Sequence, residues 1–92
     1  MYRKPETEFG RVIGCEASFS NANLERANLS NLLAVRTDFS GVIMRNCTLT
    51  RANLKQADFT GANLEGSDLT GADLSKADFS NAVLTDVNMT LT

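Results

Sequence analysis

The sequence predicts an all-β protein, a quadrilateral parallel β-helix of about four coils with twenty residues in each coil. Three observations predict it. A large apolar residue recurs at every fifth position, and a small residue, most often Ala, stands two positions before most of these residues. Phenylalanine returns every twenty residues, at Phe19, Phe39, Phe59 and Phe79.

The five-residue period excludes an α-helix and a flat strand. From Phe9 to Met89, every central residue of the period is large and apolar except Gly14 and Ala34. Five helical steps of about 100° would spread these side chains around the whole helix. In a flat strand, an odd spacing would send alternate repeats to opposite faces. The chain must therefore turn once per repeat, as it does in a solenoid.

The spacing of phenylalanine gives the number of sides. Twenty residues per coil and five per side make a four-sided tube, in which the four phenyl rings stack in one column. The residues two positions after each Phe are Asn21, Gly41, Gly61 and Asn81. Both residue types tolerate the left-handed backbone of tight turns. Coils that pair in parallel lie about 4.8 Å apart.

The pattern Ala-(Asp/Asn)-(Leu/Phe)-x-x, unbroken from Ala17 to Met89, resembles the pentapeptide repeat family. The resemblance implies a right-handed quadrilateral β-helix, in which the central residue and the residue two before it face inward. "TEFGR" and "VIGCE" are similar to degenerate repeats. We therefore expect one domain over residues 1–92, with an N-terminal cap and degenerate repeats in 1–16 and regular repeats in 17–91.

The side that carries Gly14, Ala34, Leu54 and Leu74, called here the Ala34 side, departs from the pattern. Its two small central residues have apolar neighbours: Ile13, Cys15, Leu33 and Val35. If the register holds, these four side chains form an outward patch, which soluble monomers seldom leave bare. If the backbone bulges, they turn inward and fill the space that Gly14 and Ala34 leave. The sequence leaves both interpretations open.

The ends of a solenoid expose backbone and apolar side chains unless something covers them. The polar start of the chain, with Pro5, is expected to cap the first coil. Near the C-terminus, Val87, Met89 and Leu91 continue the apolar pattern without a capping helix. We expect this coil to form a homodimer interface with two-fold symmetry, which the resemblance also implies. The alternative is that a further segment of a longer protein covers this end.

Asp38, Asp58 and Asp78 form one outward column. One interpretation is that Asp and Asn at this position bind the turn backbone locally. The other follows from the resemblance, because some pentapeptide repeat proteins mimic DNA and bind type II topoisomerases such as DNA gyrase. The chain has no histidine, and its Ser and Thr residues therefore lack the commonest activating base. We expect no catalytic residue, no cofactor and no metal site.

Composition sets the remaining expectations. The net charge is −2 over 92 residues, with +1 in residues 1–46 and −3 in residues 47–92, which is too mild to predict nucleic acid binding. No apolar run is long enough for a membrane span, and Cys15 and Cys47 have no metal or redox spacing. The sequence therefore predicts a cytoplasmic, non-enzymatic scaffold or interaction module that binds another protein, with the DNA mimic as the alternative.

Overall fold

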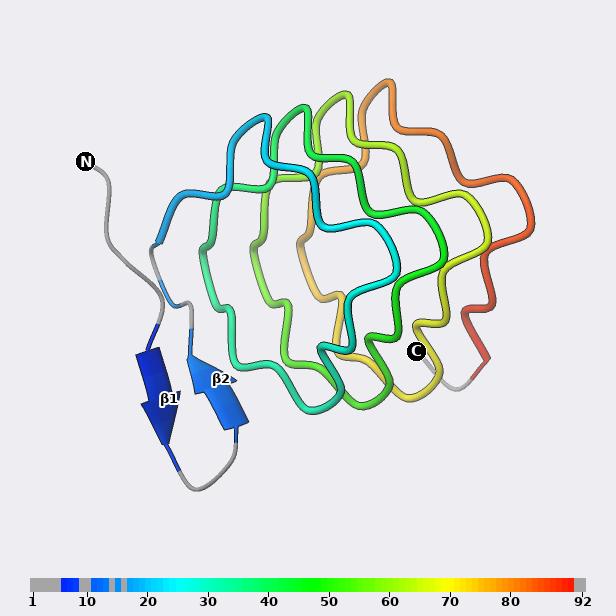
Figure 1. The fold of residues 1–92 in the computed structure, drawn as a ribbon. Coiled ribbons are helices and arrows are strands. Elements are labelled where there is room, and N and C mark those ends of the chain that lie inside the picture. The colour runs from blue at the N-terminus through cyan, green and yellow to red at the C-terminus, as the bar shows by residue number, and fades with distance from the viewer. Residues whose placement is uncertain (1–5, 9–10, 14, 16, 91–92) are drawn as a thin grey trace.

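The computed structural model describes the whole chain except residues 1–5, 9–10, 14, 16 and 91–92. From residue 17 to 90 the chain winds as a stack of square coils (Figure 1). Residues twenty apart pair in parallel, as in Ser18 with Asp38 and Asp38 with Asp58. The described part contains no helix. The predicted fold is thus confirmed.

Three backbone hydrogen bonds per side join each coil to the next. On the side that carries the phenylalanines, called the Phe side, Phe39 N–H donates to the carbonyl of Asp58 at 2.7 Å. Gly41 N–H donates to the carbonyl of Thr60 at 2.9 Å, and Asp58 N–H donates back to the carbonyl of Thr37 at 2.9 Å. The same scheme recurs on the other sides, so the repeated length of five residues follows from one repeated unit of backbone bonding.

Each corner is a tight turn whose third residue has a positive φ. In the turn Leu49–Ala52, Ala52 N–H donates to the carbonyl of Leu49 at 3.1 Å, and Arg51 has a φ of 59°. This geometry is that of a type II turn, which requires a positive φ at its third residue. The predicted turn residues conform, since φ is 61° at Asn21 and 69° at Gly61. The other corners adopt it too, even at Lys76, where φ is 57°.

The core is the axis of the tube. The four phenyl rings stack nearly parallel, with centroid separations of 5.1, 4.9 and 5.0 Å from Phe19 to Phe79. The central residues of the inner coils, such as Phe59 and Leu64, are fully buried, and so is the column of small residues two positions before them. The inward columns inferred from the sequence are therefore the core.

The Ala34 side keeps its register at Ala34, without a bulge. Leu33 pairs in parallel with Asn53, and Ala34 N–H donates to the carbonyl of Asn53 at 2.8 Å. Leu33 and Val35 thus stay in the outward columns, where each is half-buried. Leu32, two positions before Ala34, is 1% exposed and lies in the core. It supplies the bulk that the bulge interpretation assigned to the neighbours of Ala34.

Two short strands precede the coils, β1 (Glu6–Glu8) and β2 (Arg11–Ile13). They pair in antiparallel fashion, with Glu6 opposite Ile13. The hairpin stands at the N-terminal end of the stack (Figure 1). Thr7, Glu8 and Arg11, which the sequence suggests as part of a degenerate repeat, lie in this hairpin.

Candidate interaction surfaces

The predicted apolar patch on the Ala34 side is only partly in the described structure. Leu33 and Val35 lie in neighbouring outward columns, and Cys15 is half-buried one coil above Val35. The Cys15 thiol donates to the carbonyl of Leu33 at 3.7 Å. Ile13 belongs to β2, and its side chain lies outside the described part. The structure therefore brings together Cys15, Leu33 and Val35, and their role in binding remains a prediction.

Below this patch, the same side becomes polar and basic. A shallow surface hollow of about 300 Å³ is lined by Lys55, Gln56, Ser75 and Lys76. The Lys55 ammonium lies 3.8 Å from a carboxylate oxygen of Asp73. All four lining residues are exposed, so the hollow lies outside the tube, whose interior is filled by its own side chains.

The column of Asp38, Asp58 and Asp78 follows the parallel pairing of the Phe side. Each carboxylate accepts two hydrogen bonds through its Oδ1 atom from the residue two positions on. For Asp58, the donors are the Thr60 backbone N–H at 2.9 Å and the Thr60 hydroxyl at 2.6 Å. Ser40 and Ser80 do the same for Asp38 and Asp78. The local interpretation of these aspartates is confirmed.

The same contact recurs on other sides, where no acidic column exists. Asp68 accepts from Thr70, and Asp73 accepts from Ser75. The hydroxyl hydrogen bond, together with the backbone N–H, lowers the pKa of Asp68, Asp73 and Asp78. Asparagine makes the same contact in Asn28–Ser30 and Asn88–Thr90. The contact therefore serves the turn and does not depend on charge.

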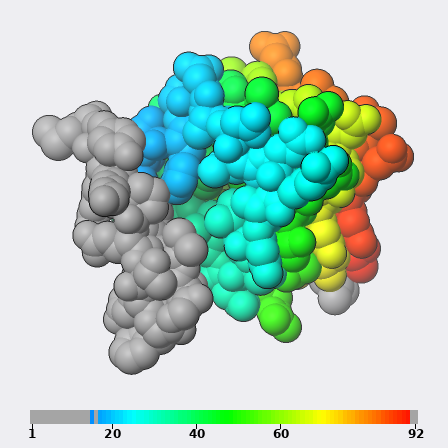
Figure 2. Space-filling view, in the orientation of Figure 1, coloured from blue at the N-terminus to red at the C-terminus, as the bar shows by residue number. Residues whose placement is uncertain are grey.

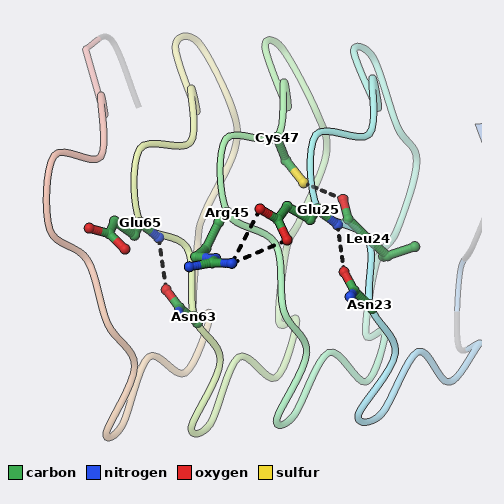
Figure 3. Close-up of polar contacts among 7 residues, drawn as sticks. All are labelled: Asn23, Leu24, Glu25, Arg45, Cys47, Asn63 and Glu65. Carbon is green, nitrogen blue, oxygen red and sulfur yellow. Dashed lines mark hydrogen bonds and ion pairs between the residues drawn. The ribbon is translucent and has the colours of Figure 1, made fainter.

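The side that follows the Phe side, called the Met44 side, carries an ion pair between coils. The Arg45 Nη2 atom lies 3.2 Å from both carboxylate oxygens of Glu25, one coil above (Figure 3). The same view shows Asn63 accepting from the backbone N–H of Glu65. The pair is partly exposed, and such pairs contribute about 0.2–1 kcal/mol.

Two polar side chains lie in the core near this corner. Cys47 is 1% exposed, and its thiol donates to the carbonyl of Leu24 at 2.8 Å (Figure 3). Burial raises the pKa of the Cys47 thiol. The Ser67 hydroxyl donates to the carbonyl of Met44 and accepts from the backbone N–H of Cys47 at 3.1 Å. It replaces the direct hydrogen bond that closes turns such as Leu49–Ala52, a role that no sequence pattern indicated.

The C-terminal coil is the least covered part of the core. Leu64 and Leu69 are 0% exposed, whereas Leu84 is 38% exposed. Val87 and Met89 are half-buried against the core, and Leu91 lies outside the described part. Val87 and Met89, predicted as part of an interface, lie together on this coil. Whether they form an interface stays a prediction.

No helix of the described part has the length and apolarity that a membrane crossing needs. The square coils and ladders of small polar residues define a β-solenoid repeat protein. The family model for pentapeptide repeats (8 copies) matches residues 5–31, 35–71 and 62–90. The chain belongs to the pentapeptide repeat family.

Two solved structures of this family are similar to the chain in fold. The structure of alr5209, a pentapeptide repeat protein from Nostoc PCC 7120, gives a TM-score of 0.84 at 29% identity over 87% of this chain. HetL, a pentapeptide repeat protein involved in heterocyst differentiation regulation in the same cyanobacterium, gives 0.51 at 21% identity over 84% of this chain. The matched region spans 66% of alr5209 and 40% of HetL. No curated protein matches the chain.

Proposed function

We propose that this chain is a non-enzymatic interaction module, a rigid four-sided rod that binds another protein through its sides. The supporting observation is the apolar pair Leu33 and Val35 in outward columns of the Ala34 side. One coil below, the same columns hold the polar residues Asn53 and Lys55. The apolar residues of this side thus lie above the level of Asn53 and Lys55.

The construction of the rod supports this role. Three hydrogen bonds per side hold each inner coil to the next, and the stacked phenyl rings fill the axis. A side held in this way loses little conformational freedom when a partner binds, which lowers the entropic cost of binding. The outward columns carry mainly Asn, Asp, Ser, Thr and Gly, so that the sides are flat.

The test is a pair of substitutions on the patch with a matched pair below it. Leu33→Ser with Val35→Ser should leave the far-UV spectrum and the cooperative melt intact and abolish capture of the partner from an extract of the source cells. Asn53→Ser with Lys55→Ser changes the same columns one coil below and should leave capture unchanged. If the Leu33/Val35 variant instead unfolds, these side chains belong to the core and the patch is wrong.

DNA mimicry is a second candidate, which the acidic column favours. Asp38, Asp58 and Asp78 make no ion pair with any other described residue, and Oδ2 of each carboxylate makes no hydrogen bond in the described part. The column is short, however, since three coils supply its charges. A gyrase supercoiling assay tests the candidate: inhibition at micromolar protein that disappears in Asp38→Asn/Asp58→Asn/Asp78→Asn would support it, and no inhibition would exclude it.

We also propose that the C-terminal coil associates with a second copy of the chain, and that the protein acts in the cytoplasm. The exposed Leu84 and the half-buried Val87 and Met89 support self-association, because exposed apolar ends of solenoids require a cap. Light scattering across a dilution series tests it, and a monomer at every concentration would exclude it.

A further inference from the structure

The lower edge of the last coil offers more donors than acceptors. Six backbone N–H groups have no acceptor in the described part of the chain, although their counterparts in the inner coils all donate to the next coil: Leu74, Lys76, Phe79, Asn81, Leu84 and Asp86. The carbonyls of Ala72, Ala77 and Ala82 are the corresponding free acceptors. A β edge of this kind is a template for pairing with another chain.

The upper edge of the first coil has the opposite composition. The chain enters this coil from the hairpin on the Ala34 side, where Cys15 contacts Leu33. On the other three sides, six carbonyls accept from no described donor: those of Ser18, Ser20, Asn23, Glu25, Asn28 and Ser30. The N–H groups of Ser18, Asn23 and Asn28 are the free donors. The central residues Phe19, Leu24 and Leu29 are half-buried here, so this edge also presents apolar surface.

Charge is divided along the same axis. Residues 17–56 carry five basic and two acidic side chains, a net charge of +3. Residues 57–90 carry one basic and six acidic side chains, a net charge of −5. In the space-filling view these two halves are the blue-to-green and the green-to-red parts of one continuous stack (Figure 2). The rod is therefore basic toward its N-terminal coil and acidic toward its C-terminal coil.

We infer that self-association is head-to-tail: the C-terminal coil of one copy stacks on the N-terminal coil of the next. The inference rests on the proposed self-association and assigns its orientation. In this orientation the Phe and Met44 sides of the two copies meet. On these two sides, four donors and two acceptors face four acceptors and two donors, the same arrangement as on each side of an internal junction. The net charges that meet are −5 and +3.

A two-fold contact between two C-terminal coils is less favourable, both in hydrogen bonding and in charge. On the sides that carry Leu74, Phe79 and Leu84, six donors on each copy would meet only three acceptors on the other, which leaves N–H groups buried without partners. The two acidic halves would also repel one another across the junction. The two-fold dimer expected from the sequence is thus disfavoured, because the lower edge of the last coil carries more donors than acceptors and an acidic charge.

Head-to-tail contacts do not close, because each added copy presents the same free end. The weight-average mass should therefore increase with concentration beyond that of a dimer. Because the contact joins opposite charges, and because the screening length is about 8 Å at physiological ionic strength, added salt should weaken the association. A two-fold contact between acidic ends would stop at the dimer, and salt would strengthen it.

Arg26 and Asp86 provide a charge-swap test. They occupy the same outward corner column at opposite ends of the rod, with φ values of 64° and 58°, so each position tolerates the residue type of the other. The experiment is sedimentation velocity on the full chain over a range of concentrations, with Arg26→Asp, with Asp86→Arg, and with their equimolar mixture. Circular dichroism and urea midpoints check folding, and the chain with both substitutions is the matched control.

Head-to-tail stacking predicts that each single variant associates at least several-fold more weakly, and that the mixture and the double variant regain association. A two-fold contact predicts the reverse for Asp86→Arg, which would associate more strongly, and no change for Arg26→Asp. That result would overturn the orientation and keep the self-association. A monomer under all conditions would overturn both, and neither result bears on the patch at Leu33 and Val35.

Discussion

Leu32 and Ala34 carry, in reverse order, the small and large side chains that Ala52 and Leu54 carry one coil below. Both upper residues are buried, at 1% and 0% exposure, in the same core cluster as the lower pair. The backbone register is unchanged between the two coils, since Leu33 pairs with Asn53. The exchange therefore concerns volume alone, and the core tolerates it because both positions face the same axis.

This relationship predicts how the side responds to substitution. Leu32→Ala leaves two small residues together and should cost about 2–5 kcal/mol of unfolding free energy, as large-to-small core changes do. Adding Ala34→Leu restores the order found below and should recover most of the loss. Urea unfolding of both variants measures the loss of unfolding free energy and its recovery. If the double variant is no more stable than Leu32→Ala, then the two side chains do not share one space.

The sequence predicts the inward columns and the phenylalanine stack well, because a period of five with one large and one small residue encodes one side of the tube. The rule that the residue two before each central residue faces inward places Leu32 in the core, but the small residues usual at that position do not predict that Leu32 supplies the bulk missing at Ala34. Nor does the sequence predict a positive φ at Arg36 or Lys76, which costs a residue with a Cβ about 1–2 kcal/mol. Arg36 adopts it because its N–H donates to the coil below.

The candidate surfaces were harder to predict than the core. The aspartate contacts follow from short-range geometry, so the sequence indicates them as one of two alternatives. The burial of Leu33 and Val35 depends on neighbours in other coils, and the free edges depend on which backbone groups lack a coil beside them. A local sequence pattern predicts neither the burial of these side chains nor the free edges. It does not predict the Ser67 bridge between Met44 and Cys47 either.

Ser67 predicts a contrast between two substitutions. In Ser67→Ala, the turn can close directly from Cys47 N–H to the Met44 carbonyl, as the turn Leu49–Ala52 does, and the loss should stay below about 1 kcal/mol. In Ser67→Val, a methyl group takes the place of the hydroxyl and holds the turn open. Its buried N–H and carbonyl then lack partners, and the loss should be about 1–3 kcal/mol larger. Equal urea midpoints for the two variants would contradict the bridging role.

The two cysteines should differ in reactivity. Cys47 is buried and its thiol pKa is raised by burial, so little reactive thiolate is present at neutral pH. Cys15 is half-buried. We expect a thiol-reactive disulfide reagent to modify one thiol rapidly in the native protein and the second only after urea is added. Cys15→Ser should remove the rapid reaction, and a fast native reaction in that variant would show that Cys47 is accessible.

Gly61 and Gly66 form a matched pair at corners of neighbouring sides. Both have a positive φ, at 69° and 72°, but a Cβ on Gly66 would overlap the side-chain oxygen of Asn46, whereas one on Gly61 meets open space. Gly61→Ala should cost about 1–2 kcal/mol from backbone strain alone, and Gly66→Ala should cost more. The excess should vanish in an Asn46→Gly background, which keeps a residue suited to the positive φ. Thermal melts measure this excess in four variants: Gly61→Ala, Gly66→Ala, Asn46→Gly, and Gly66→Ala combined with Asn46→Gly. An excess that survives Asn46→Gly must have another cause.

The hydroxyl contacts of Asp68, Asp73 and Asp78 predict a loss of stability in acid. Because folding lowers the pKa of these carboxyls from the ordinary value of 3.8, their ionised forms stabilise the fold above that pH. The contribution is lost as the pH falls through the lower folded values. Substituting all three with Asn keeps the acceptor, as at Asn28 and Asn88, and removes the titration. Urea midpoints between pH 6 and about pH 2 should therefore fall for the natural chain and stay flatter for the triple variant. A natural chain that gains stability in acid would instead show that repulsion among stacked carboxylates outweighs these hydrogen bonds.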